Sequence, residues 1–360
     1  MAGIIYSASS GLNDAKLGKL VAPLRTVIEY ESDLNKKTDD LIAALYNVEK
    51  SNNWAEAFVL QDEFADFQYA PEGARAENDT KVETRKKIVE HIPFSKTFTI
   101  TEVMLEDAHY GVSGKMKNIA QDFVRAYYKT KIKAATYALT RAVGNKKSIV
   151  FNGATIDLTC ADELPLFNKA HLYGSKQGHG EGKQSNYFYH KRAAGADISS
   201  GEVRDLLGEG ANKIRNMKDE NGDIMGYTAD TIILPGNIWK FENAVKEALG
   251  SEHNPGDSTN AINVQYGNWN LIVLPYWQVT EAEAQEYPMI LMSSEAKRNL
   301  EGSMFLNRVP LSVKDWEDQS TGNWNWRGRT RFGIAHPTYK HAVMIKSVAN
   351  GTAVSDADLI

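Results

Sequence analysis

The longest regular pattern of apolar residues in this chain has the spacing of a helix. Across 113–143 an apolar side chain recurs every three or four residues, and Gly144 follows as a stop. Met116, Ile119, Phe123, Tyr127, Ile132, Ala135, Leu139 and Val143 lie on or near one stripe. At 1.5 Å per residue this helix would be roughly 45 Å long. Such a length predicts a spine for the fold rather than a helix that fills a small domain.

Shorter helices are predicted by their capping residues. Ser199 and Glu202 have the spacing of a capping box before an amphipathic run. Asn237 has the side chain of an N-cap for another helix, which ends at Gly250. Near the start of the chain, 1–66 predicts an arm with one or two helices. Leu41, Ala44, Leu45 and Val48 have helical spacing there, with Asp39 and Asp40 in the first turn.

Strand patterns dominate the last third of the chain. The short apolar runs 231–234 and 271–274 each end at a proline and predict buried strands. Strict alternation over 323–334 predicts a longer strand with two different faces. Trp324, Trp326, Gly328, Thr330, Phe332 and Ile334 share one parity, whereas Asn323, Asn325, Arg327, Arg329 and Arg331 share the other. We therefore expect one core face and one cationic face.

A long, poorly buried hairpin is predicted over 67–102. Its arms would be 67–76 and the alternating 97–101, with a charged stretch, 77–90, between them. Arms of about 15 residues would project on the order of 50 Å, and such a hairpin is only marginally stable alone. Its charges of both signs leave little that could pack in its own domain, so we expect it to lie on a neighbour. The candidate contact residues of the hairpin are Glu77, Asp79, Lys81, Arg85, Lys86 and Lys87.

The cationic strand adds Arg308, Arg327, Arg329 and Arg331 to these candidates. An RNA-binding patch would need aromatic and arginine side chains on the same exposed face, and the alternation separates them. The arginines are instead expected to pair with acidic residues, either of the same subunit or of a neighbouring one.

Composition narrows the class of protein. The 360 residues are 42% hydrophobic and 24% charged, which is typical of a globular chain of one large or two modest domains. A net charge of −5 argues against a protein that grips nucleic acid by its overall charge, but not against a container for it. No run is long enough to cross a membrane, and the start of the chain lacks the features of a secretory signal, so we expect folding in the cytoplasm. Cys160 is the only cysteine, which excludes an internal disulfide.

Motifs for catalysis or cofactors fail on their spacing. The run 178–183 resembles a phosphate-binding loop but lacks its first glycine and its Ser or Thr. Asp219, Asn221 and Asp223 match a calcium loop only in part, and a hairpin turn explains them better. His171, His179 and His190 fit no compact metal motif. We therefore expect no catalytic residue, no cofactor and no metal.

Several segments together resemble the major capsid proteins of tailed bacteriophages, whose fold is shared with the floor of herpesvirus capsids and with encapsulins. The resemblance spans about 40–345. It is carried by 166–171, by 219–223 followed by 231–235 and its helix, and by 260–276, 305–311 and 326–333. Each segment is weak alone, but their order and spacing are specific.

The resemblance implies an α+β fold in six parts. These are an N-terminal arm (1–66), an extended E-loop hairpin (67–102), a peripheral domain with the spine helix (103–148) and C-terminal strands (302–348), an axial domain (149–301) and a tail (349–360). It implies a non-enzymatic protein that assembles from pentamers and hexamers into an icosahedral head around double-stranded DNA, without sequence-specific binding. The expected partners are further copies of the chain, a portal, and scaffolding or decoration proteins. The expected location is the virion, after assembly in the bacterial cytoplasm.

Three alternatives stay open at this stage. An encapsulin-like shell would keep the fold and enclose an enzyme in place of DNA. A metal-dependent enzyme would use the three histidines, and a tail or baseplate protein would form rings or tubes. Some relatives also join a hairpin lysine to an asparagine of a partner copy. Lys81, Lys86, Lys87 and Asn323 have the side chains for that bond, but no motif here demands it.

Overall fold

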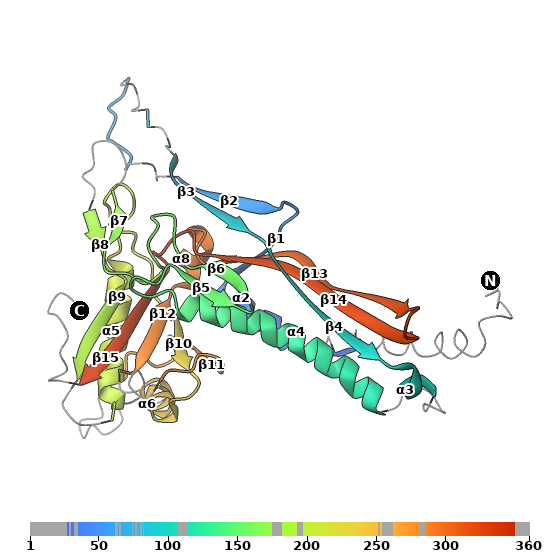
Figure 1. Cartoon of the computed structure of the whole chain (residues 1–360). Helices are drawn as coiled ribbons and strands as arrows, with labels where there is room; N and C mark the ends of the chain where they lie inside the picture. Colours follow the sequence, from blue (N-terminus) through green and yellow to red (C-terminus); the bar gives the residue numbers. More distant parts are fainter. Residues whose placement is uncertain are drawn as a thin grey trace. The chain divides into compact units, whose positions relative to one another are not determined.

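The fold is of the α+β class, as predicted, in a computed structural model of the chain (Figure 1). The structure describes 27–28, 30–31, 35–61, 64, 66–73, 75, 78–79, 81, 83–106, 114–174, 182–192, 197–250, 253, 262–280 and 286–349. The chain forms two compact units. The first contains Met1–Leu45, His91–Lys133 and Asn307–Phe332, and the second contains Tyr46–Glu90, Ala134–Leu306 and Gly333–Ile360. No helix within the described ranges is long and apolar enough to span a membrane.

The first unit is built on the predicted spine helix. This helix, α4, is Gly114–Thr140 and contributes its residues up to Lys133 to the unit. The other elements are α2 (Lys36–Leu45), β4 (Ile92–Ile100), α3 (Glu102–Glu106), and most of β13 (Met304–Asp318) and β14 (Asn323–Ala335). β14 lies between β13 and β4, and its inner face packs on α4. Figure 1 shows α4 running along these strands.

The core of the first unit forms where the apolar stripe of α4 meets the sheet. Phe123 and Val124 of α4 are buried with Ile100 and Trp326 of the strands. The rings of Phe98 and Trp326 stack with their centroids 5.2 Å apart. A Cβ atom at Gly328 would lie 2.4 Å from the ring of Phe123, so only glycine allows this close approach of strand and helix.

The second unit contains a five-stranded sheet in the order β11-β10-β12-β15-β9. The strands are β9 (Tyr187–Arg192), β10 (Thr231–Pro235), β11 (Asn270–Leu274), β12 (Pro288–Met292) and β15 (Ala342–Ala349). Helix α5 (Ser200–Arg215) packs on β12 and β15, and α6 (Trp239–Gly250) packs against α5 (Figure 1). α8 (Ser294–Asn299) follows β12. The predicted buried strands are β10, which is buried throughout, and β11, which is half-exposed because it forms an edge of the sheet.

Three small two-stranded sheets complete the second unit, and β1 (Asn47–Lys50) pairs with β13. The pairs are β2 (Ala55–Gln61) with β3 (Glu83–Glu90), β5 (Ser148–Phe151) with β6 (Ala154–Asp157), and β7 (His171–Tyr173) with β8 (Gly182–Gln184). The last pair joins the two described ends of the glycine-rich segment, with His171 opposite Gln184.

The capping predictions have mixed outcomes. The box of Ser199 and Glu202 is present at the start of α5. Asn237 does not cap α6, because its amide group donates to the carbonyl of Val279 at 2.8 Å and accepts from the Val279 amide at 3.2 Å. The hairpin turn at Asp219 is confirmed, since Asp219 Oδ1 accepts from the amides of Asn221 and Asp223. α2 ends at Leu45, so Val48 lies in β1 rather than on a helical stripe.

The hairpin is paired differently from the prediction. Its arms are β2 and β3, in the register Ala55 with Glu90, and hence begin well before Phe67. The alternating 97–101 segment is not an arm, because β4 pairs with β14 from Trp324 with Ile100 to Phe332 with Ile92. The apolar side chains of β4 explain this, since Phe98 and Ile100 belong to the core around α4.

Candidate subunit interface

The ribbon of β2 and β3 is held to its own unit by one face. Phe58 and Val89 of that face pack with Met304 and Leu306. On the same face Lys87 is only 7% exposed. Its Nζ atom donates to Asp157 Oδ2 at 2.5 Å and to Thr159 Oγ1 at 2.6 Å. The base of the ribbon is therefore fixed to its own unit, contrary to the expectation that its charged residues would find little to pack against there.

A second basic residue of this face is engaged in the same way. Arg85 Nη1 donates to the carbonyl of Leu172 at 3.2 Å and lies 3.8 Å from Glu220 Oε2. Glu220 is itself buried and also accepts from Lys340 Nζ at 3.0 Å. Arg85 and Lys87 thus bind groups of their own chain, and their contact with a neighbouring copy stays a prediction.

Lys87 also shifts the pKa of its partner, the Asp157 carboxylate. Burial alone would raise the pKa of Asp157, but the hydrogen bonds from Lys87 and Thr159 and the positive charge of Lys87 lower that pKa below its usual value. Asp157 is therefore a stable anion at neutral pH. The pair connects β3 to the end of β6.

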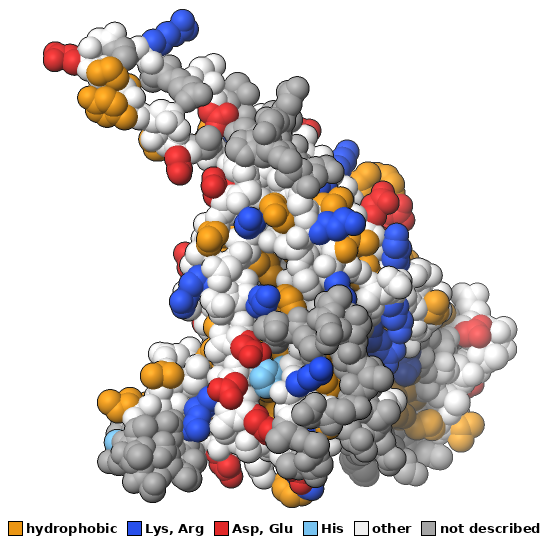
Figure 2. All heavy atoms as spheres, turned by 90° about the vertical axis from the view of Figure 1, so that its left-hand side faces the viewer, with side chains coloured by type: hydrophobic (Ala, Val, Ile, Leu, Met, Phe, Trp, Pro, Cys, Tyr) orange, Lys and Arg blue, Asp and Glu red, His pale blue; other side chains and the backbone are white. Residues whose placement is uncertain are grey.

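The opposite face of the ribbon and the hairpin tip are exposed. We define the tip as 62–82, of which the structure describes 64, 66–73, 75, 78–79 and 81. Phe67 is 106% exposed and Tyr69 is 89% exposed, and Phe64 and Ile88 are also largely exposed. Lys81 Nζ lies 5.1 Å from the ring centroid of Phe64. Figure 2 shows hydrophobic and charged side chains side by side on the segment that reaches the top of the view.

The contact candidates of the hairpin therefore separate into two groups. Lys81 and Lys86 are exposed, and Asp79 is half-buried, so these three stay predictions. Glu77 lies outside the described residues. Sequence reasoning could not distinguish Lys86 from Lys87, because only the register of the ribbon decides which of two adjacent lysines points inward.

The alternation predicted for 323–334 is confirmed. Trp326, Thr330 and Phe332 are buried, whereas Arg327 and Arg329 are exposed. We call Arg327, Arg329 and Arg331 the arginine face. Among the described residues, the side chains of Arg327 and Arg329 have no hydrogen-bond or ion-pair partner, so the expected pairing with acidic residues of the same subunit is not found for these two arginines. Arg331 Nη2 donates to the carbonyl of His91 at 3.4 Å, and Arg308 is half-buried.

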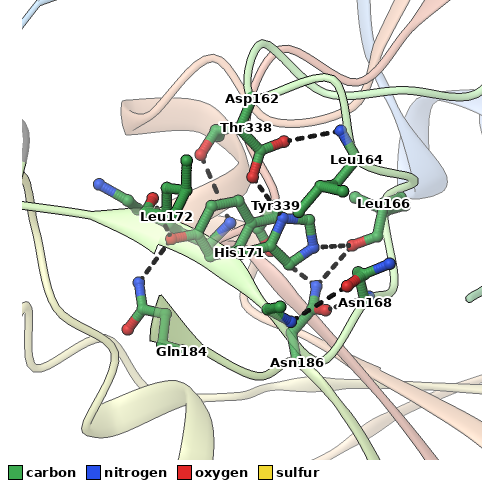
Figure 3. A network of polar contacts seen from close by, with 12 residues as sticks. Asp162, Leu164, Leu166, Asn168, His171, Leu172, Gln184, Asn186, Thr338 and Tyr339 are labelled. Carbon is green, nitrogen blue, oxygen red and sulfur yellow. Dashed lines mark hydrogen bonds and ion pairs between the residues drawn. The ribbon is translucent and has the colours of Figure 1, made fainter. Parts of the chain in front are cut away.

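A buried polar network surrounds His171 (Figure 3). His171 Nδ1 lies 2.7 Å from Asp162 Oδ2, and Nε2 lies 3.1 Å from the carbonyl oxygen of Leu166. The imidazole ring stacks on Tyr339 with the centroids 3.8 Å apart. Burial would raise the pKa of Asp162, but the hydrogen bond and charge of His171, together with two backbone amides, lower it.

This network connects separate segments of the second unit. Both ring nitrogens of His171 lie within hydrogen-bond distance of oxygen atoms of the same unit. Asn186, beside this imidazole, donates through its side chain to the carbonyls of Leu166 and Ala342, and so connects the loop before β7 to β15.

The proposed histidine metal site is not assembled by the described residues. His190 Nδ1 contacts Glu209 Oε2 at 2.7 Å, whereas His171 contacts a different carboxylate, Asp162. No group of three or more His, Cys, Asp or Glu side chains within the described ranges could hold a metal ion. His179 lies outside those ranges.

Comparison with known proteins gives similarities only among solved structures. No family model and no curated protein matches the chain. The capsid of the cyanophage P-SCSP1u is similar over 85% of this chain and 87% of its own, with 7% identity and a TM-score of 0.49. The mature capsid of bacteriophage PhiM1 is similar over 86% of each chain, with 10% identity and a TM-score of 0.49. A virus-like particle from Pyrococcus furiosus is similar over 90% of this chain and 98% of its own, with 9% identity and a TM-score of 0.44.

Proposed function

We propose that this chain is the major subunit of a closed icosahedral shell, the head of a tailed bacteriophage. The observation that carries this proposal is the hairpin: a ribbon fixed at its base by Lys87 and Arg85, with an exposed tip that presents Phe67 and Tyr69. The resemblance found in the sequence agrees with it. A fixed base and an apolar, exposed tip are what a contact with a sister copy requires.

Energetics favour a partner for the tip. Large aromatic side chains bury roughly 150–250 Å² each when they are covered, and an exposed pair of them is a typical anchor of a protein interface. The base is already anchored, so fewer residues lose conformational freedom when the tip docks. Docking is therefore more favourable than it would be for a loop that is free at both ends.

In this proposal the shell encloses double-stranded DNA and the chain catalyses nothing. Pentamers and hexamers of the chain would form the shell in the bacterial cytoplasm, and a portal with scaffolding or decoration proteins would complete the virion. Asp79, Lys81 and Lys86 are the proposed polar contacts of the hairpin. The division into arm, hairpin, peripheral domain and axial domain stays a prediction, with the hairpin arms moved to β2 and β3.

The test replaces the aromatic anchors of the tip. We expect the wild-type chain to form closed shells in sedimentation and negative-stain microscopy, and Phe67→Ser/Tyr69→Ser to shift the protein to unassembled subunits. A matched control, Gln68→Ser/Asn78→Ser, changes exposed polar residues of the same tip and is expected to assemble normally. Equal unfolding curves of the two variants would show that the subunit itself is intact.

Two results would contradict the proposal. One is a wild-type chain that stays monomeric at high concentration, or forms open tubes or rings. The other is an aromatic double variant that builds shells as readily as the control. Shells purified from the host that contain an enzyme and no nucleic acid would support the encapsulin-like alternative in place of a phage head.

A further inference from the structure

We propose that the outer face of the sheet of β4, β13 and β14 is a binding surface for the phosphate backbone of nucleic acid. This inference deepens the proposed function, and depends on it only for the source of the nucleic acid. The surface consists of the arginine face and the exposed side chains of the two strands on either side of it.

The strand register places hydroxyl groups beside the arginines. Arg327 is paired with Thr97 of β4, and Arg329 is paired with Ser95. Paired residues of antiparallel strands point to the same face of a sheet. Thr97 and Ser95 are exposed, as are both arginines, so cations and hydroxyl donors lie together on one side.

β13 extends this surface on the other side of β14. Its exposed residues alternate with half-buried ones over 310–316, and the exposed set includes Ser312, Lys314 and Trp316. Val313, of the opposite parity, packs against the core around α4. Lys314 and Ser312 therefore point away from that core, on the same side of the sheet as the arginine face.

The acidic residues nearby do not neutralise this surface. Asp315 and Glu317 of β13 have the parity opposite to Lys314, although Glu317 is exposed. Asp318 lies at the hairpin end, where its carboxylate accepts hydrogen bonds from Ser320 and Thr321. Within the described ranges Lys314, Arg327 and Arg329 make no ion pair with any carboxylate. Segments 91–133 and 307–332 together contain 12 Lys and Arg against 7 Asp and Glu, although the whole chain is acidic, with 41 against 46.

The chemistry favours phosphate over a protein partner. Guanidinium, ammonium and hydroxyl groups are the usual donors to phosphate oxygens. The centre of a protein interface is depleted of charge and enriched in apolar side chains, and this surface is the reverse, with Trp316 its one large exposed apolar side chain among the described residues. Arginines two residues apart on a strand are about 6.8 Å apart, which suits repeated contacts along a regularly charged polymer.

The same geometry predicts binding without sequence preference. The rings of Trp324 and Trp326 have the inner parity, and Trp326 is buried, so neither can stack on a base. Contacts to phosphate alone carry no sequence information. Affinity should therefore be the same for duplexes of different sequence and should fall steeply with salt.

The experiment measures binding of full-length, unassembled subunits to a 30-base-pair duplex (roughly three helical turns, long enough for several phosphate contacts) by fluorescence anisotropy over a range of salt concentrations. Arg327→Gln/Arg329→Gln removes two exposed cations. Since each lost phosphate contact lowers the slope of log K against log salt by about 0.9, we expect the slope to fall by about 2 and the affinity to fall on the order of tenfold near 0.15 M salt. The control, Lys50→Gln/Lys183→Gln, removes the same charge from exposed positions of the second unit and should change neither quantity.

The remaining outcomes would contradict either this inference or the shell function. Unchanged affinity and slope in the arginine variant would exclude phosphate binding at this surface, and an equal loss in the control would reduce the effect to net charge. Loss of shell assembly with unchanged DNA binding would assign the arginines to a sister copy. If the variant forms shells and binds DNA like the wild type, this inference fails while the shell function stands. If the wild type binds DNA through these arginines but never forms shells, this inference stands while the shell function fails.

Discussion

Lys87 determines how firmly the hairpin ribbon is held to its own unit. Its ammonium group is buried and has two oxygen partners, Asp157 and Thr159, whereas the adjacent Lys86 is exposed. Removal of a buried donor leaves its acceptor without a partner. The cost is moderated here because the Asp157 side chain is 57% exposed, so water can replace the lysine.

We therefore expect Lys87→Ala to lower the free energy of unfolding by about 1 to 2 kcal/mol. Lys86→Ala removes the same atoms from the exposed face and should change it by less than about 0.5 kcal/mol. Urea unfolding followed by tryptophan fluorescence measures both. Equal effects of the two substitutions would contradict the register of the ribbon.

A buried cluster of Ser303, His336 and His341 makes the second unit sensitive to acid. Ser303 Oγ lies 2.8 Å from His336 Nδ1 and 2.9 Å from His341 Nε2, and His336 Nε2 faces the carbonyl of Ala138. Burial lowers the pKa of His336 to about 4 and that of His341 to about 3. Both imidazoles are therefore neutral in the folded chain at neutral pH.

The sign of the pH effect follows from these values. In the unfolded chain a histidine takes up its proton near pH 6.5, so between about pH 6.5 and 4 the unfolded chain binds more protons than the folded one. The free energy of unfolding should fall as the pH is lowered through this window. We expect the free energy of unfolding to differ less between pH 7 and pH 5 in His341→Gln than in the wild type, by about 2 kcal/mol. The control His253→Gln changes an exposed histidine and should leave this difference unchanged. If His341→Gln kept the pH dependence of the wild type, buried His341 would not be the cause of the loss of stability in acid.

The partners of individual buried side chains could not be predicted from the sequence. Lys87 was among the predicted contact residues, but its true partner, Asp157, is 70 positions away in the chain and follows no pattern. The same is true of Ser303 with His336 and His341. Pairings of this kind depend on tertiary contacts, for which spacing along the chain contains no signal.

At the scale of elements, α5 shows how closely a helix and a sheet approach. A Cβ atom at Gly210 would lie 2.4 Å from Leu291 of β12 and 2.5 Å from Ile345 of β15. Gly208, two residues earlier in the helix, is exposed, and a Cβ atom there would have no other atom within 4 Å. The two glycines thus differ only in the face of the helix on which they lie.

Alanine substitutions should separate these two positions. Gly208→Ala is expected to raise the free energy of unfolding by about 0.5 to 1 kcal/mol, because alanine is the better helix former. Gly210→Ala is expected to lower it by about 1 to 3 kcal/mol, because the added methyl group overpacks the contact with the sheet. Thermal and urea unfolding measure both, and stabilisation by both substitutions would disprove the close packing of α5.

Elements with a strong period were predicted well. The spine helix and the alternating strand at Trp326 were found because one face of each is buried along its whole length, so the period appears in the sequence. The hairpin was misplaced because the alternation of 97–101 indicates a strand but not its partner. The apolar residues of β4 pack on α4, which sequence distance does not reveal.

For the whole molecule, the exposed tip predicts a difference between free and assembled protein. Arg75 and Lys81 are exposed in the tip, outside any strand, so trypsin should cut free subunits there first. In a shell whose tips lie on sister copies these bonds should be protected by at least about tenfold, since cleavage then requires undocking. Mass spectrometry of the fragments over time measures the two rates, and equal rates would contradict docking of the tip.

The general architecture was accessible from the sequence, whereas the placement of its contacts was not. The order and spacing of several weak segments indicated the α+β fold, because these segments are spread over much of the chain. The sequence does not indicate which surface of a sister copy the tip would contact. The sequence therefore indicates candidate contact residues such as Asp79 and Lys81, but not the residues of a neighbouring copy that they would contact.

The two-faced strand β14 also restricts how this protein can change length. Since side chains alternate strictly across it, insertion or loss of one residue between Trp324 and Phe332 would turn the remainder over, with arginines facing α4 and tryptophan rings in water. Only paired insertions or deletions would preserve the facing. Peptide tags and foreign epitopes of odd length are accordingly expected to be poorly tolerated anywhere along this strand.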